Sequence, residues 1–213
     1  MTPRYDADGV TIYQQSMDAV LREADLWPTQ TVITDPPYLN FHQGQSIAWA
    51  ETYNEKEDIE WLRGVNWWHR VWVPLVARLV ERSDGRAWIF EHLLYLPSLT
   101  RVCHLLRWPI RRLWMRGSSG HALILCGHGI GRDQEARVEA AVDAWAGYPR
   151  QQRPLIDTLL DISGPGPVLD PFMGRGAVVL AAQARGWPVV GVDISEACCR
   201  ETIEALHAQQ AHQ

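Results

Sequence analysis

Val-Leu-Asp-Pro-Phe-Met-Gly-Arg-Gly-Ala at residues 168–177, followed by Val-Val-Gly-Val-Asp at 189–193, is the most informative part of this chain. The pattern predicts a strand, a glycine-containing turn, a helix and a second strand that ends in an acid. Gly174 and Gly176 allow a tight turn and the close approach of a ligand, and the helix start offers free N–H groups. Asp193 ends the second strand, where a carboxylate can accept hydrogen bonds from ribose hydroxyls. The stretch therefore predicts an α/β unit that binds a nucleoside.

The acid inside the turn distinguishes this segment from dinucleotide-binding motifs. Those motifs read G-x-G-x-x-G and hold a pyrophosphate, which the carboxylate of Asp170 would repel. A carboxylate beside the turn instead suits a cofactor with a positively charged amino group. A lone G-x-G is weak evidence, whereas D-P-F-x-G-x-G with the acid Asp193 downstream is a specific pattern. The turn therefore predicts a nucleoside cofactor with a cationic end.

A second segment, Val-Ile-Thr-Asp-Pro-Pro-Tyr at 32–38, runs from an apolar strand directly into D-P-P-Y. The prolines remove two backbone donors and keep the chain extended, so the carbonyl before Pro37 faces outward. The loop would present the Asp35 carboxylate, the Pro36 carbonyl and the Tyr38 ring at the end of a strand, where open α/β sheets bind ligands. Two acceptors and a ring suit a planar group that bears an NH2. We favour this interpretation over a proline-terminated strand with a core tyrosine.

Short apolar runs alternate with longer amphipathic stretches along the chain, which is typical of an α/β sheet protein. The expected strands are Val10–Tyr13, Thr31–Thr34, Arg86–Phe90, Ile110–Met115, Ala122–Cys126, Val168–Asp170 and Val189–Asp193. The expected helices are Met17–Ala24, Asp58–Arg82, Leu96–Leu106, Gln134–Ala146, Pro154–Asp161, Ala177–Arg185 and Glu196–Ala208. Pro74 predicts a kink or a break in the second helix, where Trp68 and Trp72 recur at core spacing.

Composition bounds the class of protein. The 213 residues suffice for one domain with a sizeable core, and 46% hydrophobic with 21% charged residues excludes disordered and fibrous classes. No apolar run reaches the roughly 18 residues of a membrane span, and the first residues lack a signal-peptide core. The four cysteines form no C-x-x-C pair, and Cys126 with His128 is too sparse for a metal site. These features predict a reduced, cytoplasmic protein without a membrane span or a metal centre.

The net charge of -5 hides a basic segment between residues 101 and 132. This segment contains no acid and carries six arginines: Arg101, Arg107, Arg111, Arg112, Arg116 and Arg132. Arginine neutralises phosphates and releases their counterions, so the segment predicts a local face for a polyanion. A solvated basic face without a partner is the alternative.

The two motifs, in this order, resemble those of DNA amino-methyltransferases that use S-adenosylmethionine, in the permuted arrangement where D-P-P-Y precedes the cofactor motif. The family's D-P-F-M-G-S-G-T corresponds to residues 170–177, with Arg175 in place of serine. Residues 148–154 resemble the family's H-P-x-Q-K-P segment. Residues 12–16 resemble its Ile-Tyr-x-Gly-Asp opening, with Ser16 where the family often has Asp. The resemblance spans nearly the whole chain.

This resemblance implies a fold, a cofactor and a substrate. The fold would be Rossmann-like and circularly permuted, with a mostly parallel seven-stranded sheet and helices on both faces. Residues 1–213 would form one catalytic domain, with a catalytic half at 1–132 and a cofactor-binding half at 133–213. The cofactor would be S-adenosylmethionine, and the substrate would be the exocyclic amino group of a DNA base.

The resemblance also implies a role for each motif residue. Asp35 and the Pro36 carbonyl would hold the amino group of a base that is flipped from the duplex and stacked on Tyr38. Asp at the first position of the D-P-P-Y motif resembles enzymes that act on adenine N6 more than those acting on cytosine N4. Asp170 would hold the amino end of the cofactor, and Asp193 its ribose. The full set of expected cofactor-binding residues is Ser16, Asp170, Phe172, Gly174, Gly176, Asp193 and Ile194.

Enzymes of this type usually carry an inserted target-recognition domain, for which this chain has no room. The strand expected at Ala122–Cys126 is followed within thirty residues by the 148–154 segment. We therefore expect low sequence specificity, as in an orphan modifier of a phage or mobile element. The residues expected to contact DNA are Arg111, Arg112, Arg116, Arg132, Arg150 and Arg153.

Three alternatives remain open at this point. The enzyme could act on cytosine N4, or the chain could be a nucleic-acid-binding protein that keeps the fold without turnover, as the departures at Ser16 and Arg175 would allow. An enzyme acting on RNA or on a protein amide is less favoured, because those more often carry N-P-P-Y after the cofactor motif. The sequence also leaves the oligomeric state open, a homodimer included.

Overall fold

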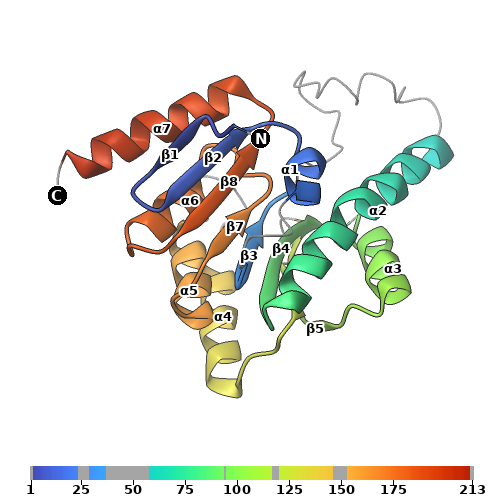
Figure 1. The fold of residues 1–213 in the computed structure, drawn as a ribbon. Helices are drawn as coiled ribbons and strands as arrows, with labels where there is room; N and C mark the ends of the chain where they lie inside the picture. Colours follow the sequence, from blue (N-terminus) through green and yellow to red (C-terminus); the bar gives the residue numbers. More distant parts are fainter. Residues whose placement is uncertain are drawn as a thin grey trace.

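Residues 2–23, 29–36, 58–93, 95–116, 120–145 and 153–211 are described by the computed structural model, with residues 58–67 and 116 described by their backbone alone. One sheet carries helices on both faces (Figure 1). The strands are β1 (Tyr5–Ala7), β2 (Val10–Gln14), β3 (Thr31–Thr34), β4 (Arg86–His92), β5 (Ile110–Arg116), β6 (His121–Gly127), β7 (Val168–Asp170) and β8 (Val189–Asp193). The helices are α1 (Met17–Glu23), α2 (Asp58–Arg82), α3 (Leu96–Leu106), α4 (Arg132–Ala144), α5 (Arg153–Ser163), α6 (Ala177–Gln183) and α7 (Glu196–Gln210).

The strands follow the order β1-β2-β8-β7-β3-β4-β6-β5 across the sheet. Neighbours are parallel from β2 to β4, whereas β1, β6 and β5 are antiparallel to theirs. The expected α/β fold and all seven expected strands are confirmed, and β1 adds one strand to the expected seven. Asp8 and Gly9, with φ of 51° and 76°, form the two-residue turn between β1 and β2. Asp-Gly is a strong sequence signal for such a hairpin, so β1 could have been predicted from the sequence.

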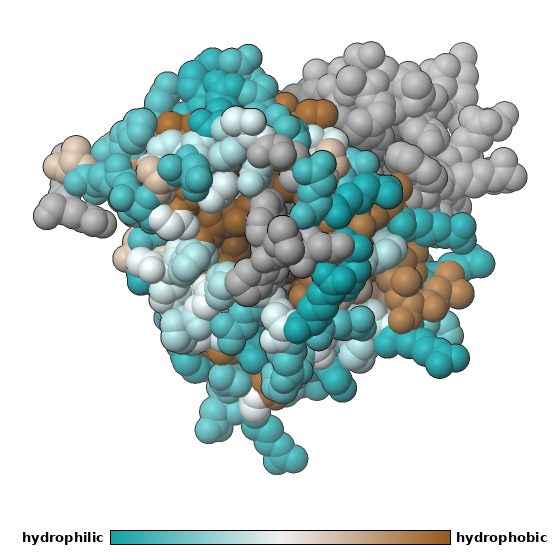
Figure 2. Space-filling model, viewed as in Figure 1, coloured by the Kyte–Doolittle hydropathy of each residue, from teal (hydrophilic) through white to brown (hydrophobic). Residues whose placement is uncertain are grey.

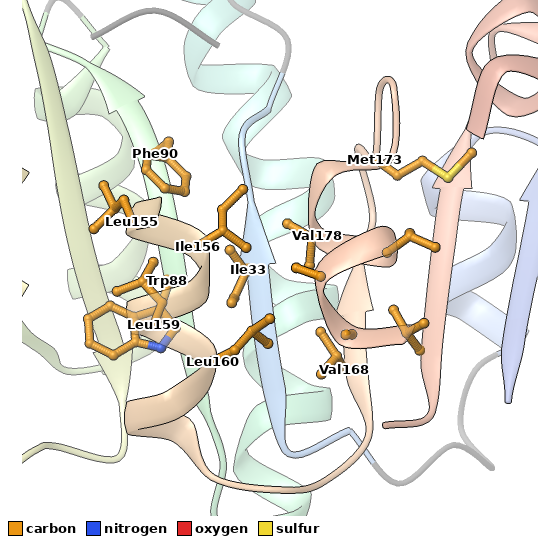
Figure 3. Packing of buried hydrophobic residues seen from close by; sticks show 14 of the residues in the cluster. Ile33, Trp88, Phe90, Leu155, Ile156, Leu159, Leu160, Val168, Met173 and Val178 are labelled. Atoms are coloured by element: carbon orange, nitrogen blue, oxygen red, sulfur yellow. The ribbon is translucent and has the colours of Figure 1, made fainter. Parts of the chain in front are cut away.

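Side chains on successive positions of the strands point to opposite faces and form two cores. On one face, Trp88 of β4 packs in a cluster that includes Leu155 and Leu159 of α5 (Figure 3). On the other face, Ile89 belongs to a cluster built with α1, α2 and α3. Burial on both faces explains why the central strands are apolar at nearly every position.

Helix α2 continues through Pro74, so the proline does not break it. Trp72, Val73 and Val76 are fully buried on either side of the proline. Packing on this scale outweighs the lost backbone hydrogen bond, because burying each large apolar side chain contributes roughly 1.5–3 kcal/mol. Trp72 is a core residue and Trp68 packs partly buried against the same core, which confirms the prediction from their spacing.

Five parallel strands, β2, β8, β7, β3 and β4, end on one side of the sheet, which we call the carboxyl edge. Gln14 at the end of β2 pairs with Asp193 at the end of β8. His121 at the start of β6 pairs with both His92 and Arg116. Strand β6 therefore begins at the carboxyl edge, whereas β5 ends there. Ligands of open α/β sheets bind at this edge, and both sequence motifs lie on it.

The surface of the face shown in Figure 2 is mostly hydrophilic, with scattered hydrophobic areas. One of these lies over α3, where Leu105 and Leu106 are exposed. Among the described helices, none combines the length and the low polarity that crossing a membrane requires.

Candidate active site at the carboxyl edge

Asp170 is the most deeply buried acid of the site and ends strand β7. Its Oδ1 accepts hydrogen bonds from the Thr34 hydroxyl at 3.1 Å and from the Phe172 backbone N–H at 3.1 Å. Its pKa is raised to about 8, mainly by burial and also by the charges of Asp35 and Asp193, against the lowering effect of these two bonds. The site therefore contains a carboxyl group that a positively charged ligand would ionise.

The two sequence motifs meet at this carboxylate. Thr34, which directly precedes Asp35, ends β3 and bonds to Asp170 on the neighbouring parallel strand. The Asp35 charge acts on the Asp170 carboxyl group, and Pro36 is buried at the same end of the strand. Asp35 and the turn at residues 170–176, which we call the cofactor turn, thus lie on one side of the molecule, as the sequence predicted. Pro37 and Tyr38 lie outside the described residues.

Asp193 closes the other side of the turn. Its Oδ2 accepts a hydrogen bond from the Gly174 N–H at 2.9 Å, and its Oδ1 accepts one from the Ser195 N–H at 2.8 Å. Burial raises its pKa, although the backbone bonds partly oppose this. The Ile194 backbone also interacts with this carboxylate. The two oxygens together offer about four acceptor positions, so the carboxylate can still accept a hydrogen bond from a ligand's hydroxyl group.

The two glycines of the turn have different neighbours. Gly174 has φ of 51° and a Cβ there would meet no atom within 4 Å, so the space beside it admits a ligand. Gly176 has φ of 77°, and a Cβ there would overlap the side chain of Thr202 in α7. Gly174 therefore faces space, whereas Gly176 is required for packing.

Replacing Gly176 with alanine should destabilise the protein more than replacing Gly174. Both positions have positive φ, which costs an L-residue about 1 kcal/mol. Only Gly176→Ala adds the overlap with Thr202, on the order of 2–3 kcal/mol more. Urea unfolding of both variants, without any ligand, measures the difference. Equal losses would mean that α7 moves away without cost.

The side chain of Phe172, a residue of the cofactor turn, packs against α2. Its ring is 5.3 Å from that of Trp68 and 5.8 Å from that of Trp72, measured between centroids. Ile194, directly after Asp193, is 61% exposed, so an apolar surface remains available for a flat ring. Ser16 is exposed just past the end of β2, the strand that pairs with β8. The expected cofactor residues therefore gather around a single turn.

Arg175, where the family has serine, points away from this group. Its guanidinium forms an ion pair with Glu201 of α7 at 3.1 Å and is largely exposed. The arginine is thus accommodated on the surface between the turn and α7.

The expected DNA-binding arginines separate into two groups. Arg116 ends β5 at the carboxyl edge, and Arg153 begins α5. Figure 3 shows the start of this helix, at Leu155, beside Phe90 near that edge. Arg153 pairs with Asp157 at 3.1 Å, and Arg150 lies outside the described residues.

Arg111, Arg112 and Arg132 lie toward the opposite edge. Arg111 donates to the carbonyl of Gly127, the residue that pairs with the first residue of β4. Arg132 begins α4 after the loop that leaves this end of β6. A groove of about 480 Å³ between β5 and α4 is lined by both Arg111 and Arg112, but also by Glu139 and Asp143. The structure therefore does not bring these three arginines to Asp35.

Sequence reasoning missed Thr34 and the Trp68–Phe172 contact. Thr34 places a hydroxyl directly before D-P-P-Y, and a polar residue at the buried end of an apolar strand was the available signal. The aromatic contact joins residues that are about one hundred positions apart, which no local pattern reveals.

Comparison with protein-family models and with curated proteins gives no match. Among solved structures, the Thermus thermophilus protein TTHA0409, provisionally described as a DNA modification methylase, has a TM-score of 0.66 at 18% identity over 91% of this chain and 93% of its own. M1.HpyAVI has a TM-score of 0.60 at 15% identity, over 93% and 99%. The cytosine-N4-specific PvuII DNA methyltransferase has 0.61 at 12%, over 91% and 84%. Complexes of the first two with S-adenosylmethionine match as well. At these identities the likeness shows the fold, and this chain has the fold of these proteins over nearly its whole described length.

Proposed function

We propose that this chain is a DNA methyltransferase that transfers a methyl group from S-adenosylmethionine to the exocyclic amino group of a flipped base. The observation that carries the proposal is the hydrogen bond from Thr34 to Asp170, because it sets Asp35 and Pro36 beside the cofactor turn. The structural neighbours support it, since two of them are known in complex with S-adenosylmethionine and a third is named as a DNA methyltransferase.

The residues at the turn suit S-adenosylmethionine. Asp170 would accept the cationic amino group, which favours its ionised form. Asp193 would bind the ribose hydroxyls, and the exposed Ile194 would cover one face of the adenine. Gly174 leaves space for the ligand, while Phe172, Gly176 and Ser16 complete the proposed site. When bound, this cofactor supplies a methyl group attached to a positively charged sulfur.

The acceptor side of the proposed site would work by positioning. The lone pair of a base amino group is delocalised into the ring, which makes the nitrogen a poor nucleophile. Hydrogen bonds from the two amino hydrogens to Asp35 and to the Pro36 carbonyl would favour a tetrahedral nitrogen with an available lone pair. Pro37 would stiffen the loop, and Tyr38 would stack on the flipped base. The Asp35 carboxylate can receive the proton that the nitrogen releases after methylation.

Adenine N6 is the proposed target, because the motif begins with Asp. For DNA contact we propose Arg116 and Arg153 at the carboxyl edge, together with Arg150, which would neutralise phosphates. The further set Arg111, Arg112 and Arg132 would meet DNA only if the duplex extends around β5. Residues 1–213 would act as one catalytic domain with low sequence specificity. Because β2 pairs with β8, the proposed halves at 1–132 and 133–213 interleave in the sheet.

The test is transfer of labelled methyl from S-adenosylmethionine to duplex and single-stranded DNA, followed by digestion to nucleosides. We expect label in N6-methyladenine, spread over many sequence contexts. Label in N4-methylcytosine alone would overturn the choice of base, and one long methylated motif would overturn the low specificity. Weak or absent binding of S-adenosylmethionine, with no transfer to DNA, would favour the binding-protein alternative.

A further inference from the structure

A buried polar bridge joins three elements next to the candidate site. His69 of α2 contacts Glu91 of β4 through Nε2 and Oε2 at 3.0 Å, and Ser98 of α3 through Nδ1 and Oγ at 2.9 Å. His69 is 1% exposed and Glu91 is 2% exposed. Burying such groups is costly unless they are paired, and apolar residues of similar size often stabilise a fold as well. The bridge therefore calls for a role beyond stability.

One end of the bridge, Glu91, lies level with Pro36 of the proposed acceptor site. Ile89 of β4 pairs with Thr34 of β3, so Glu91 lies two residues further along its strand, as Pro36 does on the neighbouring strand. The second carboxylate oxygen of Glu91 accepts a hydrogen bond from the His92 backbone N–H at 2.9 Å. The carboxylate is thus held from two sides at the carboxyl edge.

His69, the middle of the bridge, connects to the cofactor turn through three aromatic rings, its own included, and one hydrogen bond. The His69 ring meets the edge of Trp72 at 5.9 Å, and Trp72 meets Phe172 at 5.8 Å. The Phe172 N–H then donates to Asp170 at 3.1 Å. A shift of His69 would therefore move the residues that line the proposed cofactor pocket.

We infer that His69 is a positioning residue for the methyl donor. Glu91 and Ser98 fix His69, and Trp72 in turn holds the Phe172 side chain of the cofactor turn in place. This inference rests on the proposed function and adds to it a group that touches neither the cofactor nor the base. The bridge fixes the position of α2 relative to the sheet. Through the contacts of His69 with Trp72 and of Trp72 with Phe172, it also fixes the position of the Phe172 ring.

The test measures cofactor binding by calorimetric titration with S-adenosylmethionine. In Ser98→Ala and His69→Leu we expect the Kd to rise about tenfold, and the KM for the cofactor to rise with kcat nearly unchanged. Glu91→Gln should bind nearly as the wild type does. Its carbonyl can accept from the His92 N–H while its NH2 donates to His69, whose other nitrogen then donates to Ser98.

Ser163→Ala is the matched control. Ser163 accepts a buried hydrogen bond from Trp88 at 3.0 Å, also between a helix and β4, but on the face of the sheet away from α2. Thermal unfolding shows how far each variant is destabilised, and Ser98→Ala carries the test should His69→Leu fail to fold. An unchanged Kd in Ser98→Ala, or an equal rise in Ser163→Ala, would overturn the inference. A wild-type protein that does not bind the cofactor would instead reject the proposed function, and the inference with it.

Discussion

Replacing Asp35 with alanine should reduce kcat for methyl transfer by about 10²–10⁴-fold, the usual loss when a group that handles a reacting proton is removed. The charge of Asp35 also raises the pKa of Asp170. Removing that charge therefore lowers the pKa of Asp170 and favours the ionised form that a cationic ligand needs. We expect the variant to bind S-adenosylmethionine at least as tightly as the wild type does, while it fails to transfer the methyl group.

Calorimetry for binding and label transfer for catalysis separate these two effects. Asp35→Asn is the conservative variant: it keeps one acceptor and should retain more activity than Asp35→Ala. Asp133→Ala is a suitable control, because this acid is exposed in the first turn of α4, away from the carboxyl edge. Full activity in Asp35→Ala would contradict the proposed acceptor site. Lost cofactor binding would mean that Asp35 belongs to the cofactor pocket instead.

The meeting of the two motifs could be predicted from sequence because parallel strands end on the same edge. Each motif follows an apolar strand, and only their adjacency, here β3 next to β7, had to be supplied by the structure. Their contact is then a consequence of register, since Val32 pairs with Leu169, Asp170 directly follows Leu169, and Thr34 lies two residues after Val32.

The positions of the arginines in the basic segment 101–132 were harder to predict, because they depend on the direction in which each strand runs. Strands were expected at Ile110–Met115 and Ala122–Cys126, but a strand pattern reads the same in either direction. Strand β6 runs antiparallel to β4, and β5 runs antiparallel to β6, so β5 has the direction of the parallel strands. Arg116 at its end therefore reaches the carboxyl edge, while Arg111 lies toward the other. The sequence therefore showed which charged residues are present in this segment, but not which edge of the sheet each of them reaches.

Replacing Asp170 with asparagine should abolish cofactor binding and at the same time stabilise the protein at pH 8 without cofactor. Asparagine keeps the oxygen that accepts from Thr34 and Phe172, and it removes a buried charge. The pKa of Asp170 is raised from 3.8 to about 8, so the folded protein holds a proton that the unfolded chain has lost. The stability that this group contributes to the wild type is therefore fully present below the unfolded pKa, and it is lost as pH rises toward the folded pKa. The slope from this group approaches 1.4 kcal/mol per pH unit between those values.

Urea unfolding of wild type and Asp170→Asn from pH 5 to pH 9 isolates the effect of the Asp170 charge, since titrating residues that do not interact with Asp170 contribute equally to both proteins. The stability difference should grow in favour of the variant as pH rises and level off above about pH 8. The same proton opposes the cofactor, because an amino group binds the ionised carboxylate. Wild-type affinity for S-adenosylmethionine should therefore increase from pH 6 to pH 8, with release of a proton seen as buffer-dependent heat. A stability difference that does not change with pH would show that Asp170 is already ionised in the free protein, and that its burial is compensated by donors other than Thr34 and Phe172.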